Sequence, residues 1–306
     1  MALFIEVLRS LFILKGKNMS YNEILFENIY NACVYIIEKS DDKYIKKKKE
    51  KLDFAYKKVQ DLNDCEVQEF FATAHELKTY EMLKGLKLLP VANNDETPGV
   101  DFTSKLGNIE CVTFMKPSDE LSKRILSGNL NRHKAYEPRV TQALNEKLNK
   151  YKSYLSKWQI DASRPNIICL NPGICGYDIH YETFITACQR VLYGVGDEAL
   201  IVNRETNERT WSHLYQNKII KPNGQEINAD IFNTDDYKII SGILLIDNLV
   251  DKPYTRPILY INPNANVKID RRSIKKVMCL LKHSDSAYHY VCNGKATNIY
   301  KYKGIG

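Results

Sequence analysis

Long apolar runs are absent from this chain of 306 residues. No stretch reaches the roughly 18 uninterrupted apolar residues that suggest a transmembrane helix, so no membrane partner is expected. The N-terminal segment MALFIEVLRSLFILKGK is apolar, but Glu6 and Arg9 interrupt it and no small-residue cleavage site follows, which argues against a signal peptide. It is interpreted as an amphipathic helix, or as a leader ahead of an alternative start at Met19, and a cytoplasmic location is expected.

The chain also lacks the cysteine spacing of a zinc-binding motif. None of its eight cysteines forms a Cys-x-x-Cys pair, and several lie inside apolar runs, such as Cys111 in NIECVTF and Cys169 in NIICLN. Free, buried cysteines in a reducing compartment are therefore predicted in preference to disulfides or a zinc set.

Several catalytic signatures are missing as well. The sequence contains no Gly-x-Ser-x-Gly, no phosphate-binding P-loop and no His-Glu-x-x-His. The segment YGVGDE is too short for a dinucleotide-binding fingerprint and is predicted to end a helix and lead into a strand. His180 and Tyr181 follow NPGICGYD in a predicted loop, where such residues are more often structural or exposed than catalytic.

Positive charge, by contrast, is in excess and is concentrated. The net charge is +7 and the sequence pI is ≈ 8.8, which hints at a polyanionic partner. Residues 123–157 hold nine Lys or Arg against two Glu, an excess equal to that of the whole chain. From this segment we predict nucleic-acid phosphate contacts by Arg132, Lys134, Lys147 and Lys150. The run IKKKKEK is flanked by acidic residues and is interpreted as a solvated helix face.

The pattern of the chain changes near residue 65. Before it, NEILFENIYNACVYIIEK has apolar residues close to the 3.6-residue period, and a charged helix is predicted from about Asp42 to Leu62. We therefore predict a helical N-terminal segment over 1–64, packed on the main domain or leaning away from it, and an α/β domain over 65–306.

Strands alternate with helices after residue 65, which predicts a mixed β-sheet flanked by helices. A long helix ends at Gly85, and VDFT and IECVTFM form a hairpin through the turn SKLGN. A basic amphipathic helix is predicted over about 138–159, with Pro138 in its first turn. The remaining predicted elements are the strands KLLPVA, NIICLN, EALIV, IISGILLID and ILYIN, the helices FITACQRVLYG and RRSIKKVMCLLK, and a hairpin turn at 222–224.

Three carboxylates stand on these elements. Glu76 lies in an apolar strip of the long helix, Asp101 on the first hairpin strand and Glu110 on the second. Asp101 and Glu110 are nine residues apart across a tight turn, so they can face each other and bind Mg²⁺ (or Mn²⁺), which prefers oxygen ligands. Glu76 could orient a water or hold a second ion. The alternative is structural: Asp101 follows a turn, Glu110 pairs with a basic residue, and Glu76 is satisfied on its helix.

The order of these elements resembles a known family. A helix with Glu, then PGVDF, then IECVT resembles the core of the PD-(D/E)XK (restriction-endonuclease-like) nucleases. The segments PGVDF, NIECVTF, RVTQALNEKLNKYKSYL, YGVGDEALIVNRETNE, IISGILLID and INPNA resemble more closely a group of uncharacterised bacterial proteins of that type, over about residues 66–265. The resemblance implies a restriction-endonuclease-like core in which Asp101 and Glu110 bind metal and Glu76 assists.

The chain departs from the family pattern at two positions. Val100 replaces the proline before Asp101, and Val112 stands where the family carries a catalytic lysine, two residues after Glu110. That lysine would stabilise charge on the phosphate. We predict that the following helix supplies the missing cation through Arg139, or less directly through Lys147, and that Arg139→Ala abolishes metal-dependent cleavage.

Two functions are consistent with these residues. The first is a Mg²⁺-dependent phosphodiesterase acting on DNA or RNA, with Glu76, Asp101, Glu110 and Arg139 as catalytic residues. The second is a catalytically inactive nuclease-like domain that binds nucleic acid or a protein partner. A homo-oligomer is compatible with either.

Overall fold

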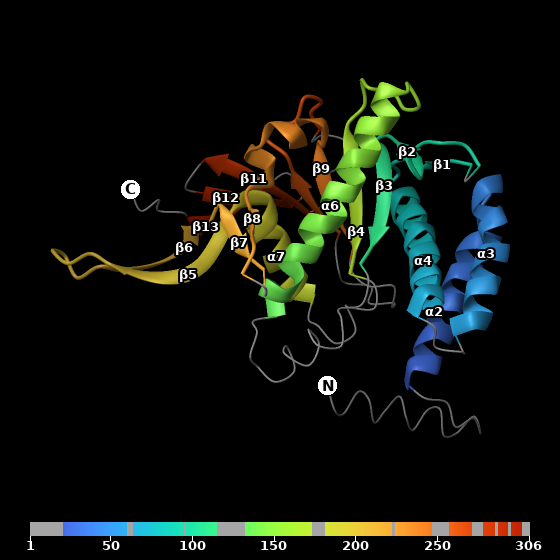
Figure 1. Ribbon diagram of the computed structural model, residues 1–306, viewed down its shortest axis with the longest axis horizontal. Coiled ribbons are helices and arrows are strands. Elements are labelled where there is room, and N and C mark those ends of the chain that lie inside the picture. The colour runs from blue at the N-terminus through green and yellow to red at the C-terminus, as the bar shows by residue number, and fades with distance from the viewer. Residues whose placement is uncertain are drawn as a thin grey trace.

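The centre of the molecule is a nine-stranded sheet (Figure 1). The computed structural model describes residues 21–301 apart from 60–63, 95, 115–131, 173–180, 222–223, 247–256, 271–277, 285–286 and 293–294. In sheet order the strands are β1 (Val91–Ala92), β2 (Phe102–Ser104), β3 (Gly107–Thr113), β4 (Asn166–Asn171), β9 (Gly242–Leu245), β10 (Ile258–Ile261), β11 (Met278–Ser284), β12 (Ala287–Cys292) and β13 (Lys295–Lys301).

The sheet is mixed, as the sequence predicts. Its centre is parallel, because β4 runs parallel to both β3 and β9. On one side β1, β2 and β3 are antiparallel, and on the other β9 pairs antiparallel with β10. All residues of β4 and β9 are buried, which explains why their sequences NIICLN and GILL read as continuous apolar runs.

Helices cover both faces of the sheet, and the side chains of β4 alternate between the two layers. Ile167 and Cys169 belong to a core that includes α2–α4, whereas Ile168 and Leu170 belong to a core that includes α6 and α7. Figure 1 shows α2–α4 grouped together beside β3, and α6 crossing the sheet next to β4. The helices are α2 (Tyr21–Glu38), α3 (Lys43–Val59), α4 (Asp64–Gly85), α6 (Arg132–Ser156) and α7 (Tyr181–Tyr193).

The predicted N-terminal helices pack on the main domain and do not lean away from it. Ile29 and Cys33 of α2 and Leu52 of α3 share one buried core with Leu77 of α4 and Ile109 of β3. The 3.6-residue pattern placed Ile29 of α2 on the buried face correctly, but Tyr35, which fits the same pattern, is 58% exposed. The predicted N-terminal leader lies outside the described residues, and the division into domains at residue 64 stays a prediction. In the described part of the chain, no helix is long and apolar enough to cross a membrane.

Two predicted details are wrong. The helix expected over RRSIKKVMCLLK is contradicted in its second half, because Met278–Ser284 form β11. This strand pairs with β10 on one edge and β12 on the other, and such pairing on both sides satisfies its backbone groups in the sheet. Pro138 lies inside α6 and not in its first turn, because the helix begins at Arg132.

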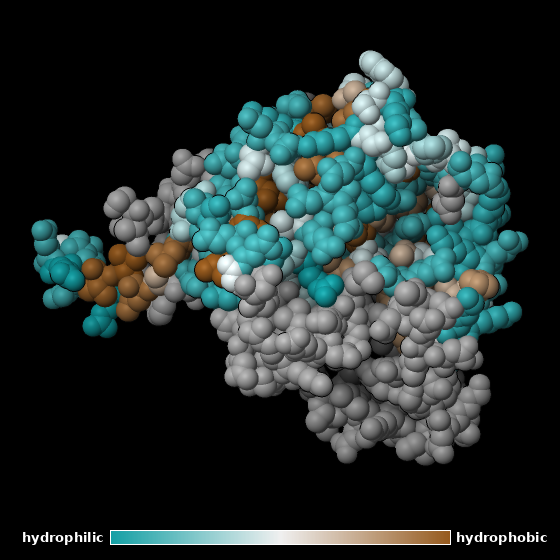
Figure 2. Space-filling model, in the orientation of Figure 1, coloured by the Kyte–Doolittle hydropathy of each residue, from teal (hydrophilic) through white to brown (hydrophobic). Residues whose placement is uncertain are grey.

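One predicted strand belongs to a separate hairpin. The EALIV segment is part of β5 (Val195–Val202), which pairs with β6 (Arg209–Tyr215) in a two-stranded sheet. This hairpin extends from the body as an arm in Figure 1, and Figure 2 shows apolar surface along it. The predicted turn at 222–224 is confirmed as a hairpin by the antiparallel pairing of β7 (Lys218–Ile220) with β8 (Glu226–Asn228), although residues 222–223 themselves lie outside the described part.

Candidate functional site

Asp101 and Glu110 come together on the β2–β3 hairpin. Phe102 of β2 pairs with Ile109 of β3, so the next position outward places Asp101 opposite Glu110. Asp101 Oδ2 accepts a hydrogen bond of 2.6 Å from the backbone N–H of Cys111. Loss of hydration raises the pKa of Asp101 well above its ordinary value, and the negative charges of Glu76 and Glu110 raise it further. The charges of Glu76 and Glu110 thus both act on Asp101.

Glu110 is almost fully buried and points toward α6. It is 1% exposed, and its neighbours Ile109 and Cys111 pack on the opposite face of the sheet. Its Oε1 accepts hydrogen bonds from Lys147 Nζ at 2.8 Å and from Lys150 Nζ at 2.9 Å. Its Oε2 is buried and has no hydrogen-bond partner among the described residues. Since an unpartnered buried carboxylate oxygen is costly, a cation at Oε2 would stabilise the site.

The position of α6 follows from its apolar stripe. Leu144 and Leu148 pack in the same core as Ile168 of β4, as the repeat of apolar residues in this helix predicts. Tyr151 fixes the helix along its length, because its hydroxyl lies 2.7 Å from the carbonyl oxygen of Ile167 and 3.0 Å from that of Asn108. In this position α6 places Lys147 and Lys150 over Glu110.

The cations of α6 that contact Glu110 in the described part of the chain are Lys147 and Lys150, whereas the sequence prediction placed Arg139 first. Val112, an uncharged residue, is partly buried and packs against the core that includes α6 and α7. Lys147 is 12% exposed and Lys150 is 52% exposed, and both contact Glu110. Arg139 is half-buried and stands two turns earlier, about 12 Å along the helix axis from Lys147. The contact with Glu110 is thus made by Lys147, and a role of either cation in cleavage stays a prediction.

Glu76 is held by an ion pair that the sequence did not predict. Its Oε2 lies 2.5 Å from Nζ of Lys48 in α3, and Lys48 is itself buried. A carboxylate in an apolar strip needs such a partner, which explains how Glu76 is accommodated. The negative charge of Glu76 also raises the pKa of Asp101 from the side of α4.

The pH dependence of stability should report the raised pKa of Asp101. Between its ordinary pKa of 3.8 and its raised pKa, the folded chain keeps a proton that the unfolded chain releases. The contribution of Asp101 to the free energy of unfolding should therefore fall as pH rises through that window. Asp101→Asn keeps an acceptor for the Cys111 N–H but removes this slope, so the variant should be more stable than wild type at neutral pH. Urea unfolding at several pH values measures the difference. An identical slope in both proteins would contradict it.

The other predicted contact residues are scattered. Lys134 lies 3.7 Å from Asp197 of β5, and half-exposed Lys150 is bound to Glu110. Arg132 begins α6, but its side chain lies outside the described part, as do residues 123–131 with their basic side chains. His180 also lies outside it, and Tyr181 begins α7. A phosphate-binding role of Arg132, Lys134, Lys147 and Lys150 stays a prediction.

The oxygens of Asp101 and Glu110 are of the kind that a hard divalent cation binds. Mg²⁺ takes oxygen ligands and usually keeps several waters, so one or two carboxylates suffice. The free Oε2 of Glu110 and the carboxylate of Asp101 supply such oxygens, and the mutual repulsion that raises the pKa of Asp101 would be relieved by a cation. Binding of Mg²⁺ or Mn²⁺ by Asp101 and Glu110 stays a prediction.

Sequence reasoning missed two groups of residues. Lys48 lies in the charged run of α3 and looked like one of several solvated lysines, yet it is buried against Glu76. His75, Cys111 and Cys169 form a buried cluster on the other face of the sheet. Adjacent side chains on a strand point to opposite faces, so the sequence does predict that Glu110 and Cys111 lie on different faces of the sheet. The spacing of residues along the chain does not, however, indicate that His75, Cys111 and Cys169 from three elements meet.

Comparisons with protein-family models, with curated proteins and with solved structures found no match for this chain.

Proposed function

We propose that this protein is a Mg²⁺-dependent phosphodiesterase that acts on DNA or RNA, built on a restriction-endonuclease-like fold. The order of elements supports the fold: α4 precedes the β2–β3 hairpin, and α6 then crosses from β3 to the parallel strand β4. This is the order that the resemblance implies. Glu76 lies on α4, Asp101 directly precedes β2, and Glu110 lies on β3.

The observation that carries the proposal is the buried pair Asp101 and Glu110 with Lys147 above it. Buried carboxylates that repel one another are costly unless they serve a cation, and an ammonium beside them is what a phosphodiester needs for charge stabilisation.

Each residue has a defined task in this proposal. Asp101 and Glu110 would hold the ion, and the ion when bound would supply an activated water and offset charge on the phosphate. Lys147, which now neutralises Glu110, would contact a non-bridging phosphate oxygen. Glu76, held by Lys48, would orient the water from the α4 side. Half-exposed Lys150 would meet the nucleic-acid backbone at the rim of the site.

A cleavage assay tests the proposal. Plasmid DNA, single-stranded DNA and structured RNA are incubated with the protein in Mg²⁺, Mn²⁺ or EDTA. We expect metal-dependent cleavage of at least one substrate, and a loss of about 10²-fold or more in Glu110→Gln, because metal stabilisation contributes several kcal/mol. Glu146→Gln, on the exposed side of the same helix, is the control and should leave the rate unchanged. Cleavage that persists in EDTA, or in Glu110→Gln at the wild-type rate, would contradict it.

A second candidate is a nuclease-like domain that binds nucleic acid or a protein without cleaving. The observation that favours it is the double pairing of Glu110 Oε1 with Lys147 and Lys150, which neutralises this carboxylate without a metal. Isothermal titration separates the two: the phosphodiesterase should bind Mn²⁺ with an affinity that Asp101→Asn removes, whereas the inactive domain should bind nucleic acid equally well with and without metal.

A further inference from the structure

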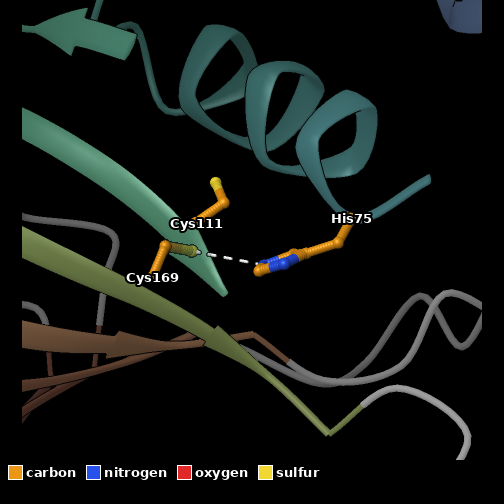
Figure 3. Close-up of side chains that lie close together, drawn as sticks. All are labelled: His75, Cys111 and Cys169. Carbon is orange, nitrogen blue, oxygen red and sulfur yellow. Dashed lines mark hydrogen bonds between the residues drawn. The ribbon is translucent and has the colours of Figure 1, made fainter. Parts of the chain in front are cut away.

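A second cluster of ligand atoms lies on the face of the sheet opposite Glu110. His75 of α4, Cys111 of β3 and Cys169 of β4 are buried, and their ligand atoms lie within 4.8 Å of one another. Figure 3 shows the three side chains between α4 and the two strands, with the Cys169 sulfur directed at the imidazole. The Cys169 Sγ to His75 Nε2 distance is 3.6 Å. Three elements that are far apart in sequence thus place two thiols and one imidazole together.

The imidazole is oriented as a metal ligand would be. His75 Nδ1 lies 3.1 Å from the Thr113 hydroxyl oxygen, while Nε2 faces the sulfur of Cys169. With Nδ1 donating its proton to Thr113, Nε2 carries the free lone pair on the side of the two cysteines. A hydrogen bond of this kind on the remote nitrogen is how ligating histidines are held in the correct tautomer and orientation.

We propose that His75, Cys111 and Cys169 bind Zn²⁺. Sulfur and imidazole donors select zinc over Mg²⁺, which prefers oxygen. Charge favours the same ion, because Zn²⁺ with two thiolates and a neutral imidazole has no net charge, and a neutral complex is the one that a buried apolar region tolerates. Binding would release the two thiol protons to solvent and form two Zn–S bonds and one Zn–N bond.

The cluster is slightly wider than a loaded site. Zn–S bonds of ~2.3 Å and Zn–N bonds of ~2.0 Å imply donor separations of ~3.5–3.8 Å in a tetrahedron. The Cys169 to His75 distance of 3.6 Å already fits, and the other separations, at up to 4.8 Å, would close by rotation of the Cys111 side chain. The Thr79 hydroxyl oxygen adjoins both sulfurs, at 3.6 Å from Cys169 Sγ and 3.7 Å from Cys111 Sγ.

Such an ion would pin α4 to the central strands. His75 adjoins Glu76 and Cys111 adjoins Glu110, so the zinc site would fix the two elements that carry these carboxylates relative to each other. The inference does not rest on the proposed phosphodiesterase activity, because metal content is measured without any substrate.

Metal analysis of the full chain tests the proposal. The protein is produced in zinc-supplemented medium and freed of loosely bound metal, and its zinc content is measured by inductively coupled plasma mass spectrometry. We expect about one zinc per chain in the wild type. Cys111→Ala and Cys169→Ala should retain less than about a tenth of that zinc, since each removes a ligand. Cys188→Ala is the matched control, because Cys188 is equally buried but packs on the other face of the sheet, and it should keep the full content.

Two further measurements keep the test decisive where a cysteine variant does not fold. Protein produced with Co²⁺ in place of zinc should show the sulfur-to-cobalt charge-transfer absorption of a thiolate site. Thr113→Val, which keeps all three ligands and loses the hydrogen bond to His75, should bind zinc about 10- to 100-fold more weakly. The proposal is overturned by wild-type protein with less than about a tenth of an equivalent of zinc. Zinc retained by both folded cysteine variants would overturn it as well. So would a Cys111–Cys169 disulfide in the purified protein, which the pairing of these residues on adjacent strands allows.

Discussion

Replacing Lys147 with Met should reduce metal-dependent cleavage by about 10²- to 10³-fold, the loss typical of removing one group that stabilises transition-state charge. Met keeps much of the length of the lysine stem, so the packing of α6 is retained and the loss can be assigned to the ammonium. The expectation follows from the position of Lys147, which contacts Glu110 at 2.8 Å and is largely buried. Rates on the best substrate from the cleavage assay, with saturating Mg²⁺ or Mn²⁺, measure the effect.

Two neighbouring variants make this result specific. Lys150→Met should weaken substrate binding more than it lowers the cleavage rate, because Lys150 is half-exposed at the rim of the site. Arg139→Ala, which the sequence alone marks as the critical change, should now have a small effect, because Arg139 lies two turns away from the lysine that faces Glu110. Loss of cleavage in Arg139→Ala with full activity in Lys147→Met would reverse this assignment.

The largest loss of stability is expected for Arg190→Met. Arg190 is 3% exposed and joins three parts of the fold, with Nε 2.5 Å from Glu137 Oε1, Nη1 2.7 Å from Asp197 Oδ1 and Nη2 2.6 Å from Gln216 Oε1. Without it, Glu137 on α6 is left buried and unneutralised, and burial already raises the pKa of Glu137 against the opposing charge of Arg190. Breaking a buried ion pair from one side costs about 3–5 kcal/mol in the free energy of unfolding. Urea denaturation monitored by circular dichroism measures it.

The double variant Glu137→Gln with Arg190→Met provides the control for that prediction. It removes both charges, so it should recover a substantial part of the lost stability. Lys152→Met breaks an exposed pair with Asp236 and should change the free energy of unfolding by less than about 1 kcal/mol. If Arg190→Met is no more destabilising than Lys152→Met, the buried network does not stabilise the junction of α6, α7 and the β5–β6 arm.

The sequence determined by itself those features that depend on neighbours along the chain. The 3.6-residue repeat predicted most of the buried faces of α2 and α6, although Tyr35 and Trp158, which fit the same repeats, are exposed. The spacing of Asp101 and Glu110 across a tight turn agrees with the register of β2 and β3, which extends to that pair. The apolar segments NIICLN and IISGILLID predicted the strands β4 and β9. These properties follow from backbone geometry, because helical and strand periods assign each residue to a face before any tertiary contact forms.

Only the tertiary structure decided which residues from different elements meet. Lys147 and Arg139 share a flank of one helix, and the seating of α6 by Tyr151 brings the first of them to Glu110. Met278–Ser284 form a strand because they pair with β10 on one edge and with β12 on the other. The packing of α3 on α4 brings Lys48 to Glu76, and the packing of α4 on the sheet brings His75 to Cys111 and Cys169. Such pairings depend on how elements dock in three dimensions, and the spacing of residues along one chain does not encode that docking.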